Sequence, residues 1–360
     1  MKVFCTALFL FNFFLSTQVL GQRVSESFEF EFENKTLSGL IEKAEGQNPQ
    51  ALVIIIPGYG RTDFVEGQWF SQLRDHFVNA GLTVVLWDKM GCGKSKGVFD
   101  AQQPVKNSAQ EALTAIEEIK RLKVAGYEKI GLWGISRAGW ICPLINQQFP
   151  IDFWISVSGT DDKENYGYLL RENLIIAGKT GAEADLLHQA WLAAHKAQCT
   201  AASFEEYLAA VKPLTEDSLC QKLFNYTAIK EITPAARLAY QQEIQNYTRK
   251  GYFDEESGLW VYIEDFDQVL HQIKCPVLAL FGEKDSQVDW RKTKRLYEQS
   301  IGTASQNAQL TTKVFEQCNH SLQKCESCAF GEDLSAFNWQ ACNNYYETIT
   351  DWLRDNSIID

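Results

Sequence analysis

Hydrophobic residues follow two different patterns along the chain, and each pattern predicts a different kind of β-strand. Residues 28–32 alternate strictly between phenylalanine and glutamate, which is typical of a strand with one face in solvent. Residues 36–41 are predicted to form its antiparallel partner. Later runs are apolar at consecutive positions, as expected for strands covered on both faces: residues 51–56, 82–87, 129–133, 153–157, 276–281 and, more weakly, 312–315.

Helical segments lie between these apolar runs. They are predicted at residues 68–80, at 108–123, after Ser136, at 290–300 and at 342–354. Ser108 and Glu111 have the spacing of a capping box and place a helix start at Ser108. Because strand and helix alternate, we expect a mostly parallel central sheet flanked by helices, a doubly wound α/β fold. Ligands of such sheets bind at the carboxyl ends of the strands.

The alternation fails between residues 160 and 270. Residues 182–196, 203–211 and 234–249 are amphipathic helices with no strand between them. We therefore predict a core that contains the sheet at residues 22–160 and 271–360, with a helical cap at 161–270 inserted over the strand ends. A separate helical domain is the alternative, but no Pro/Gly-rich linker marks its boundaries.

The N-terminal 21 residues have the pattern of a secretory signal peptide. Lys2 precedes an apolar stretch at 3–15, and Val19-Leu20-Gly21 precedes a cleavage site at Gln22. A membrane anchor is the weaker interpretation, because the apolar stretch is shorter than the ~20 residues a spanning helix needs. We therefore expect a secreted or periplasmic protein without a stable membrane anchor.

Composition and charge narrow the class of partner. The chain is 45% hydrophobic and has a formal net charge of -12, which argues against nucleic acid. Neither composition nor charge predicts the oligomeric state.

The most informative segment is residues 129–140, where an apolar run breaks into small residues around Ser136. A strand that turns sharply into a helix exposes a serine at the turn, and it needs small residues two positions before and after that serine. Gly134 and Ala138 occupy these positions, although glycine is usual at the second. Because so short a pattern also occurs by chance, Ser136 needs a base, an acid and an oxyanion site elsewhere.

His320 is the predicted base, because only this histidine follows the last strand, where a Ser…Asp…His order places it. Asp285 follows the buried run 276–281 and is the predicted acid that orients His320. Glu283, Asp289 and Asp161 are the alternatives for the acid. The histidines given surface or core positions are His76, His188, His195 and His271.

The oxyanion hole is predicted from the end of the first buried strand. Gly58 and Tyr59 end that strand and face the turn at Ser136. The backbone N–H groups of Tyr59 and Arg137 are the predicted donors.

Four stretches carry a resemblance to a known family: residues 56–60, residues 87–95, the turn at Ser136 with Trp140 and Pro143, and residues 274–285 with 319–323. Together they resemble the secreted serine hydrolases of the α/β-hydrolase fold, in the branch that contains esterases and enzymes similar to prolyl oligopeptidase and serine aminopeptidases. The chain departs from the family pattern at Met90, where the family usually has a loop-pinning arginine, and at Pro57, where many members have histidine.

The resemblance implies acyl transfer to water through an acyl-enzyme on Ser136, without a cofactor or metal. It also implies a small-molecule ester or a short peptide as the substrate. Carboxylic esters are favoured, because amides need more exact protonation of the leaving group and no subsite for a peptide amine is visible. A peptidase or aminopeptidase is the alternative, since fold alone does not determine the substrate. A non-catalytic relative that only binds a ligand is a further alternative.

Cysteines near His320 allow a different interpretation. Cys318, His320, Cys325 and Cys328 have a spacing compatible with a zinc site, which would remove the base from Ser136. In an exported chain we instead expect two disulfides of undetermined pairing among the four cysteines that flank His320. These four are Cys318, Cys325, Cys328 and Cys342. Cys199 and Cys220 are a candidate third pair, whereas Cys92, Cys142 and Cys275 are expected to stay reduced.

Overall fold

The computed structural model describes residues 22–227, 232–301 and 309–360. The predicted signal peptide at residues 1–21 lies outside the described residues. Within the described part, no helix is long and apolar enough to cross a membrane.

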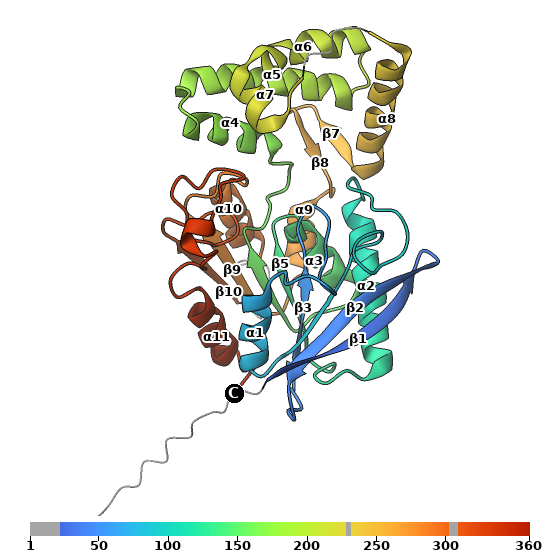
Figure 1. Ribbon diagram of the computed structural model, residues 1–360, viewed down its shortest axis with the longest axis vertical. Helices are drawn as coiled ribbons and strands as arrows, with labels where there is room; N and C mark the ends of the chain where they lie inside the picture. The colour runs from blue at the N-terminus through green and yellow to red at the C-terminus, as the bar shows by residue number, and fades with distance from the viewer. Residues whose placement is uncertain (1–21, 228–231, 302–308) are drawn as a thin grey trace, which may run out of the picture.

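An eight-stranded, mostly parallel sheet forms the centre of the molecule, as the apolar runs predict (Figure 1). Its order is β1-β2-β4-β3-β5-β6-β9-β10. The first two strands, β1 (Arg23–Phe32) and β2 (Lys35–Ala44), form the predicted antiparallel hairpin. The parallel strands are β3 (Leu52–Ile56), β4 (Thr83–Trp87), β5 (Ile130–Ile135), β6 (Phe153–Val157), β9 (Val277–Gly282) and β10 (Leu310–Phe315).

Helices cover both faces of the sheet and make a three-layer core. One face packs against α2 (Val105–Leu122), α3 (Ala138–Gln148), α9 (Phe266–His271) and α10 (Trp290–Ser300). The other packs against α1 (Ser71–Asn79) and α11 (Tyr345–Asp355). In a strand covered on both faces, every side chain is buried, which is why the sequences of these strands are continuously apolar.

The start of α2 differs from the prediction. The helix begins at Val105 after Pro104, and no side chain caps it, so the capping box at Ser108 and Glu111 does not form. A proline suits a helix start because its fixed φ is helical and its missing N–H is not needed there. Ser108 lies in the first turn, where its hydroxyl donates to Gln103 Oε1 at 2.7 Å.

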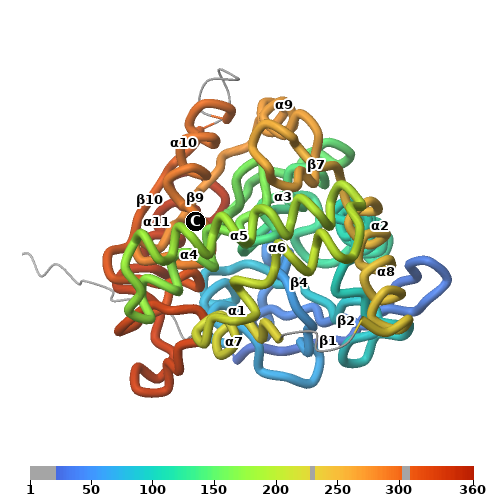
Figure 2. Tube along the Cα trace, turned by 90° about the horizontal axis from the view of Figure 1, so that it is seen from above, coloured from blue at the N-terminus to red at the C-terminus, as the bar shows by residue number. Residues whose placement is uncertain are grey.

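Residues 166–227 and 232–261 form a layer above the carboxyl ends of the strands, which we call the cap (Figures 1 and 2). Its helices are α4 (Tyr166–Ile176), α5 (Gly181–Cys199), α6 (Phe204–Glu216), α7 (Ser218–Phe224) and α8 (Pro234–Lys250). The short hairpin β7 (Tyr252–Asp254) and β8 (Leu259–Val261) completes it. The sequence patterns did not predict α4, α7 or this hairpin.

The cap has a hydrophobic cluster of its own, centred on Leu170, Trp191 and Leu214. The next helix, α9, lies in the segment predicted as cap, but its buried residues Phe266 and Leu270 belong to the cluster of the central sheet. Burial therefore groups α9 with the layer that carries the sheet.

Candidate active site

Ser136 lies on a sharp turn between β5 and α3. Its φ is 58°, a left-handed conformation that costs a non-glycine residue on the order of 1–3 kcal/mol. The Ser136 N–H donates to the Val157 carbonyl at 2.9 Å, which ties the turn to the neighbouring strand β6. The surrounding sheet thus holds the serine in a conformation that the isolated chain would avoid.

Gly134 explains how Ala138 is accommodated in this turn. A Cβ atom at Gly134 would lie 2.9 Å from the Ala138 Cβ and 2.7 Å from Cys142 Sγ. Real Cβ atoms do not approach so closely, so a side chain at Gly134 would displace α3. With glycine at 134, the extra methyl of Ala138 fits, and the departure from the usual second glycine leaves the turn intact.

His320 and Asp285 form a buried hydrogen-bonded pair. His320 Nδ1 lies 2.8 Å from Asp285 Oδ2, and the two residues are 6% and 3% exposed. Asp285 Oδ1 accepts the backbone N–H groups of Gln287 at 2.8 Å and Val288 at 3.0 Å. With both carboxylate oxygens engaged, Asp285 places the proton of the neutral imidazole on Nδ1 and leaves Nε2 as an acceptor.

The alternative acids have other partners. Glu283 accepts the Gln317 N–H at 3.2 Å, and Asp289 accepts the Arg291 N–H at the start of α10. Asp161 accepts the Lys163 N–H at 3.2 Å, and burial raises the pKa of Asp161 to about 7. Asp285 is thus the acid that contacts His320.

The other four histidines have partners away from this pair. His76 Nε2 lies 2.9 Å from Thr350 Oγ1, and His271 Nδ1 contacts the Asp267 carbonyl. His188 and His195 stack against Trp191 in the cap.

The loop after β3, residues 57–61, approaches Ser136 closely, as expected for a loop that contributes to an oxyanion hole. We call it the oxyanion loop. A Cβ atom at Gly58 would lie 3.2 Å from Ser136 Cβ and 3.7 Å from its Oγ. In the described part of the chain, no protein acceptor is paired with the backbone N–H of Tyr59 or of Arg137. Both donors that the sequence predicts are therefore available to a ligand.

The side chain of Arg137 anchors the turn to the start of α2. The guanidinium is buried and donates to Ser108 Oγ at 3.0 Å and to the Gln103 carbonyl. It also lies 5.2 Å from the centre of the Tyr59 ring, a cation–π contact. Sequence reasoning assigned Arg137 only a backbone role, and the unused capping serine is its side-chain partner.

Lys89 and Arg61 connect the oxyanion loop to the turn at residues 88–95. Lys89 Nζ donates to the carbonyls of Gly58 at 2.6 Å and Gly60 at 2.9 Å. Arg61 donates to the Gly91 carbonyl at 2.5 Å. The sequence predicted that Met90 removes a loop-pinning charge, but Lys89 and Arg61 supply charged contacts to this loop. The role of Lys89 was not predicted, because its partners are carbonyl groups that no side-chain pattern reveals.

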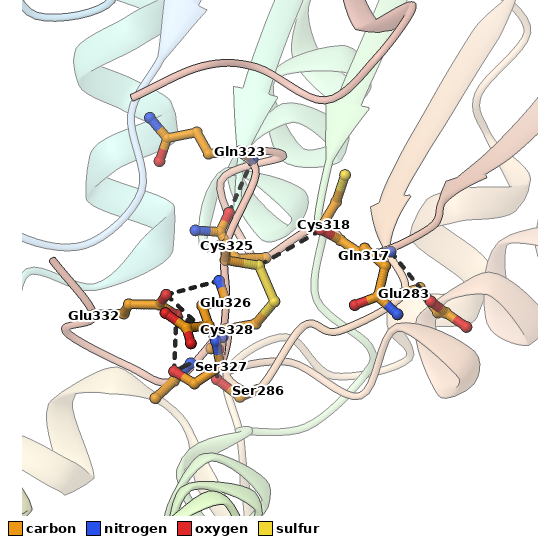
Figure 3. Close-up of a disulfide and its surroundings, with 12 residues drawn as sticks. Glu283, Ser286, Gln317, Cys318, Gln323, Cys325, Glu326, Ser327, Cys328 and Glu332 are labelled. Carbon is orange, nitrogen blue, oxygen red and sulfur yellow. Dashed lines mark hydrogen bonds between the residues drawn. A yellow bond between two sulfur atoms is a disulfide. The ribbon is translucent and has the colours of Figure 1, made fainter. Parts of the chain in front are cut away.

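Two disulfides hold the segment around His320. They pair Cys318 with Cys342 and Cys325 with Cys328, which confirms the two predicted bridges and determines their pairing. Figure 3 shows the bridge between Cys325 and Cys328. Ser286, next to Asp285, donates to the Cys328 carbonyl at 2.8 Å. The loop is thereby joined to the acid as well as to the base.

The zinc interpretation is wrong, because Cys318, Cys325 and Cys328 are bonded to other sulfurs. Among the described residues, no three His, Cys, Asp or Glu side chains are placed to hold a metal ion. The suggested third bridge is also absent: Cys199 contacts His195 Nε2 at 3.4 Å, whereas Cys220 is buried in the cap cluster. Cys92, Cys142 and Cys275 are free and buried, as expected.

Removal of the Cys318–Cys342 bridge, with both residues changed to serine, is expected to lower the free energy of unfolding by roughly 3 kcal/mol. The bridge spans 24 residues, and the loss of loop-closure entropy in the unfolded chain grows with that length. Urea unfolding followed by tryptophan fluorescence measures the change. The Cys325–Cys328 pair, with a separation of 3, is the matched control and should cost about half as much. Equal losses would contradict the loop-length argument.

The X-Pro dipeptidyl-peptidase (S15 family) model matches residues 43–321. No curated protein matches the chain by sequence.

Solved structures share the fold at low sequence identity. An esterase of Pyrococcus furiosus, Pf2001, has 13% identity and a TM-score of 0.51, with 92% of this chain and 91% of that chain covered. The proline iminopeptidase of Mycobacterium smegmatis has 16% identity and a TM-score of 0.50, with 92% and 99% covered. An acylaminoacyl peptidase of Pyrococcus horikoshii has 14% identity and a TM-score of 0.50, with 93% and 42% covered. The architecture is thus the α/β-hydrolase fold.

Proposed function

Because the chain belongs to the X-Pro dipeptidyl-peptidase (S15) family, we propose that it is a serine hydrolase that forms an acyl-enzyme on Ser136. The main observation behind the proposal is the buried contact between His320 and Asp285. Asp285 follows β9 and Ser136 follows β5, and both strands are parallel neighbours of β6, so both residues lie at the carboxyl edge of the sheet. A histidine held in this tautomer is the base that a serine nucleophile requires.

Acylation begins when Ser136 Oγ attacks the carbonyl carbon of the substrate. His320 Nε2 accepts the hydroxyl proton, and the imidazolium that forms is stabilised by the Asp285 carboxylate. The oxyanion of the tetrahedral intermediate accepts hydrogen bonds from the N–H groups of Tyr59 and Arg137. Collapse of the intermediate breaks the bond to the leaving group, which takes its proton from His320.

Deacylation repeats these steps with water as the nucleophile. His320 accepts a proton from the water as its oxygen attacks the acyl carbon, and the same N–H groups hold the second oxyanion. The proton returns to Ser136 Oγ as the carboxylic acid leaves. The net reaction adds one water molecule across an ester or amide bond.

Carboxylic esters remain our first substrate class, because an alkoxide leaving group depends less than an amine on protonation. Peptides are the second candidate, and the specific observation in their favour is the S15 family match over residues 43–321. Both classes use the same acyl-enzyme chemistry, so the substrate must be determined by experiment.

Matched substrates decide between the two classes. We would measure kcat/KM for alkyl esters of graded chain length, for a dipeptidyl X-Pro anilide with a free amine, and for the same anilide with the amine acetylated. Alkyl esters turned over at least tenfold faster than the free anilide would support an esterase. The reverse order, together with loss of activity on acetylation, would support a peptidase that reads the N-terminus.

A further inference from the structure

Lys89 contacts the oxyanion loop through backbone carbonyl groups. Its ammonium donates to the carbonyl groups of Gly58 and Gly60, which flank Tyr59 on both sides. Among the described residues, no carboxylate forms an ion pair with Lys89. The positive charge therefore acts on backbone carbonyls instead of on an acidic side chain.

Because the peptide bond is planar, the contact of Lys89 with the Gly58 carbonyl also affects the direction of the Tyr59 N–H. The bond between Gly58 and Tyr59 is trans, so the Gly58 carbonyl and the Tyr59 N–H lie in one rigid plane and point in opposite directions. Holding the carbonyl fixes the direction of the N–H. The ammonium also draws electron density from the carbonyl, which strengthens the N–H as a donor.

The loop needs such a contact because glycines lie on both sides of Tyr59. Gly60 has a φ of 93°, and glycine has more backbone freedom than any other residue. The Tyr59 side chain is 56% exposed, and its ring contacts the guanidinium of Arg137. That contact holds the side chain and not the two carbonyls, so without Lys89 the peptide planes would sample orientations in which the N–H no longer faces the reacting carbonyl.

We propose that Lys89 is a positioning residue for hydrolysis, whose ammonium orients the Tyr59 N–H toward the oxyanion by holding the carbonyls of Gly58 and Gly60. This inference rests on the proposed function, because it assigns a role in the same oxyanion hole. Lys89 acts through the backbone of Tyr59 and touches no reacting atom.

The surroundings of Lys89 predict that its contact with the two carbonyls depends on pH. Burial lowers the pKa of Lys89 to about 8, and the positive charge of Arg137 at the start of α3 acts in the same direction. Glu111 on α2 and Cys92 on the adjacent turn oppose this shift. The ammonium is therefore lost as the pH rises through about 8, and with it the charged contact to both carbonyls.

Folding stability changes in the opposite direction over this range. An unfolded lysine keeps its proton to about pH 10.4, so the unfolded chain binds more protons than the folded chain above pH 8. Deprotonation of Lys89 thus contributes stability to the fold between those values. A loss of activity above pH 8 that is caused by deprotonation of Lys89 is therefore not caused by unfolding of the protein.

Substitution at Lys89 tests the proposal. Lys89→Met keeps a side chain of similar length without the charge, and we expect kcat to fall about 10- to 100-fold with KM within about threefold, because a misaligned oxyanion donor affects the transition state. Lys89→Arg keeps a permanent charge with several donors, so it should restore most of kcat and remove the decline above pH 8. Lys94→Met is the matched control, because Lys94 lies on the same turn but is exposed and pairs with Glu66 instead of the oxyanion loop. Its kcat should stay within about twofold of the wild type.

The pH dependence of kcat and kcat/KM from pH 6 to 10 is measured for each variant, with thermal melting to check folding. The proposal would be overturned if Lys89→Met had the same kcat as the wild type. It would also be overturned if the kcat of Lys89→Arg still declined above pH 8. If Lys89→Arg does not fold, a flat wild-type profile across pH 8 overturns it equally. Phosphonate labelling that persists in Ser136→Ala would instead contradict the proposed function, so the two failures are distinguishable.

Discussion

Replacement of Ser136 by alanine is expected to abolish turnover of every substrate, with a loss approaching the ~10⁶-fold seen when a triad nucleophile is removed. The acyl-enzyme cannot form without Oγ, and no other hydroxyl occupies the turn between β5 and α3. Labelling by an organophosphonate probe should disappear at the same time. Intact-mass analysis of the labelled protein and steady-state kinetics measure both effects.

Ser158→Ala is the matched control for this substitution. Ser158 also has a left-handed backbone, with a φ of 44°, and follows the end of the neighbouring strand β6. Its buried Oγ has no hydrogen-bond partner among the described residues, so its removal leaves no partner unpaired. We expect this variant to keep its labelling and its activity. A Ser136→Ala protein that still reacts with the probe would show that the nucleophile lies elsewhere.

Asp285→Asn is expected to lower kcat on the order of 10⁴-fold while the protein stays folded. Asp285 Oδ1 accepts two backbone N–H groups, and the amide oxygen of asparagine would take over this role. The amide NH₂ would then face His320 Nδ1 and donate to it. The imidazole proton would move to Nε2, which could no longer accept the proton of Ser136.

The alternative acids provide controls of the same chemistry. Asp289→Asn and Glu283→Gln change the carboxylates on either side of Asp285 in the sequence. Asp289 accepts the Arg291 N–H and pairs with Lys292, and Glu283 accepts the Gln317 N–H. Each should keep kcat within a few-fold of the wild type, with circular dichroism and melting to confirm folding. A large loss in Asp289→Asn together with a mild loss in Asp285→Asn would reassign the acid.

Sequence patterns predicted the central sheet because strands covered on both faces can contain only apolar residues. Every one of the six buried runs is a strand, and the alternating segment at 28–32 lies in the hairpin at the sheet edge. The order of Ser136, Asp285 and His320 followed from the strands that precede them. Local composition was sufficient there, because burial of a strand constrains each of its residues.

The cap was predicted less completely. Helices α5, α6 and α8 were found from their amphipathic periodicity, whereas α7 and the strands β7 and β8 are too short to show one. Such short elements form because the tertiary structure supplies their packing. The helix start at Val105 also depends on a tertiary contact: Ser108 accepts a hydrogen bond from Arg137, 29 residues away, instead of capping its own helix.

By itself, the sequence determined the sheet, the position of Ser136 and the chain order of the candidate site, because each depends on residues that are neighbours along the chain. The tertiary structure alone decided that Cys318 pairs with Cys342, that Asp285 and not Asp289 contacts His320, and that Lys89 holds the oxyanion loop. These contacts join residues 24, 35 and 31 positions apart. Such separations are set by the packing of strands and loops, and no local pattern of residue types specifies which of several candidate partners will meet.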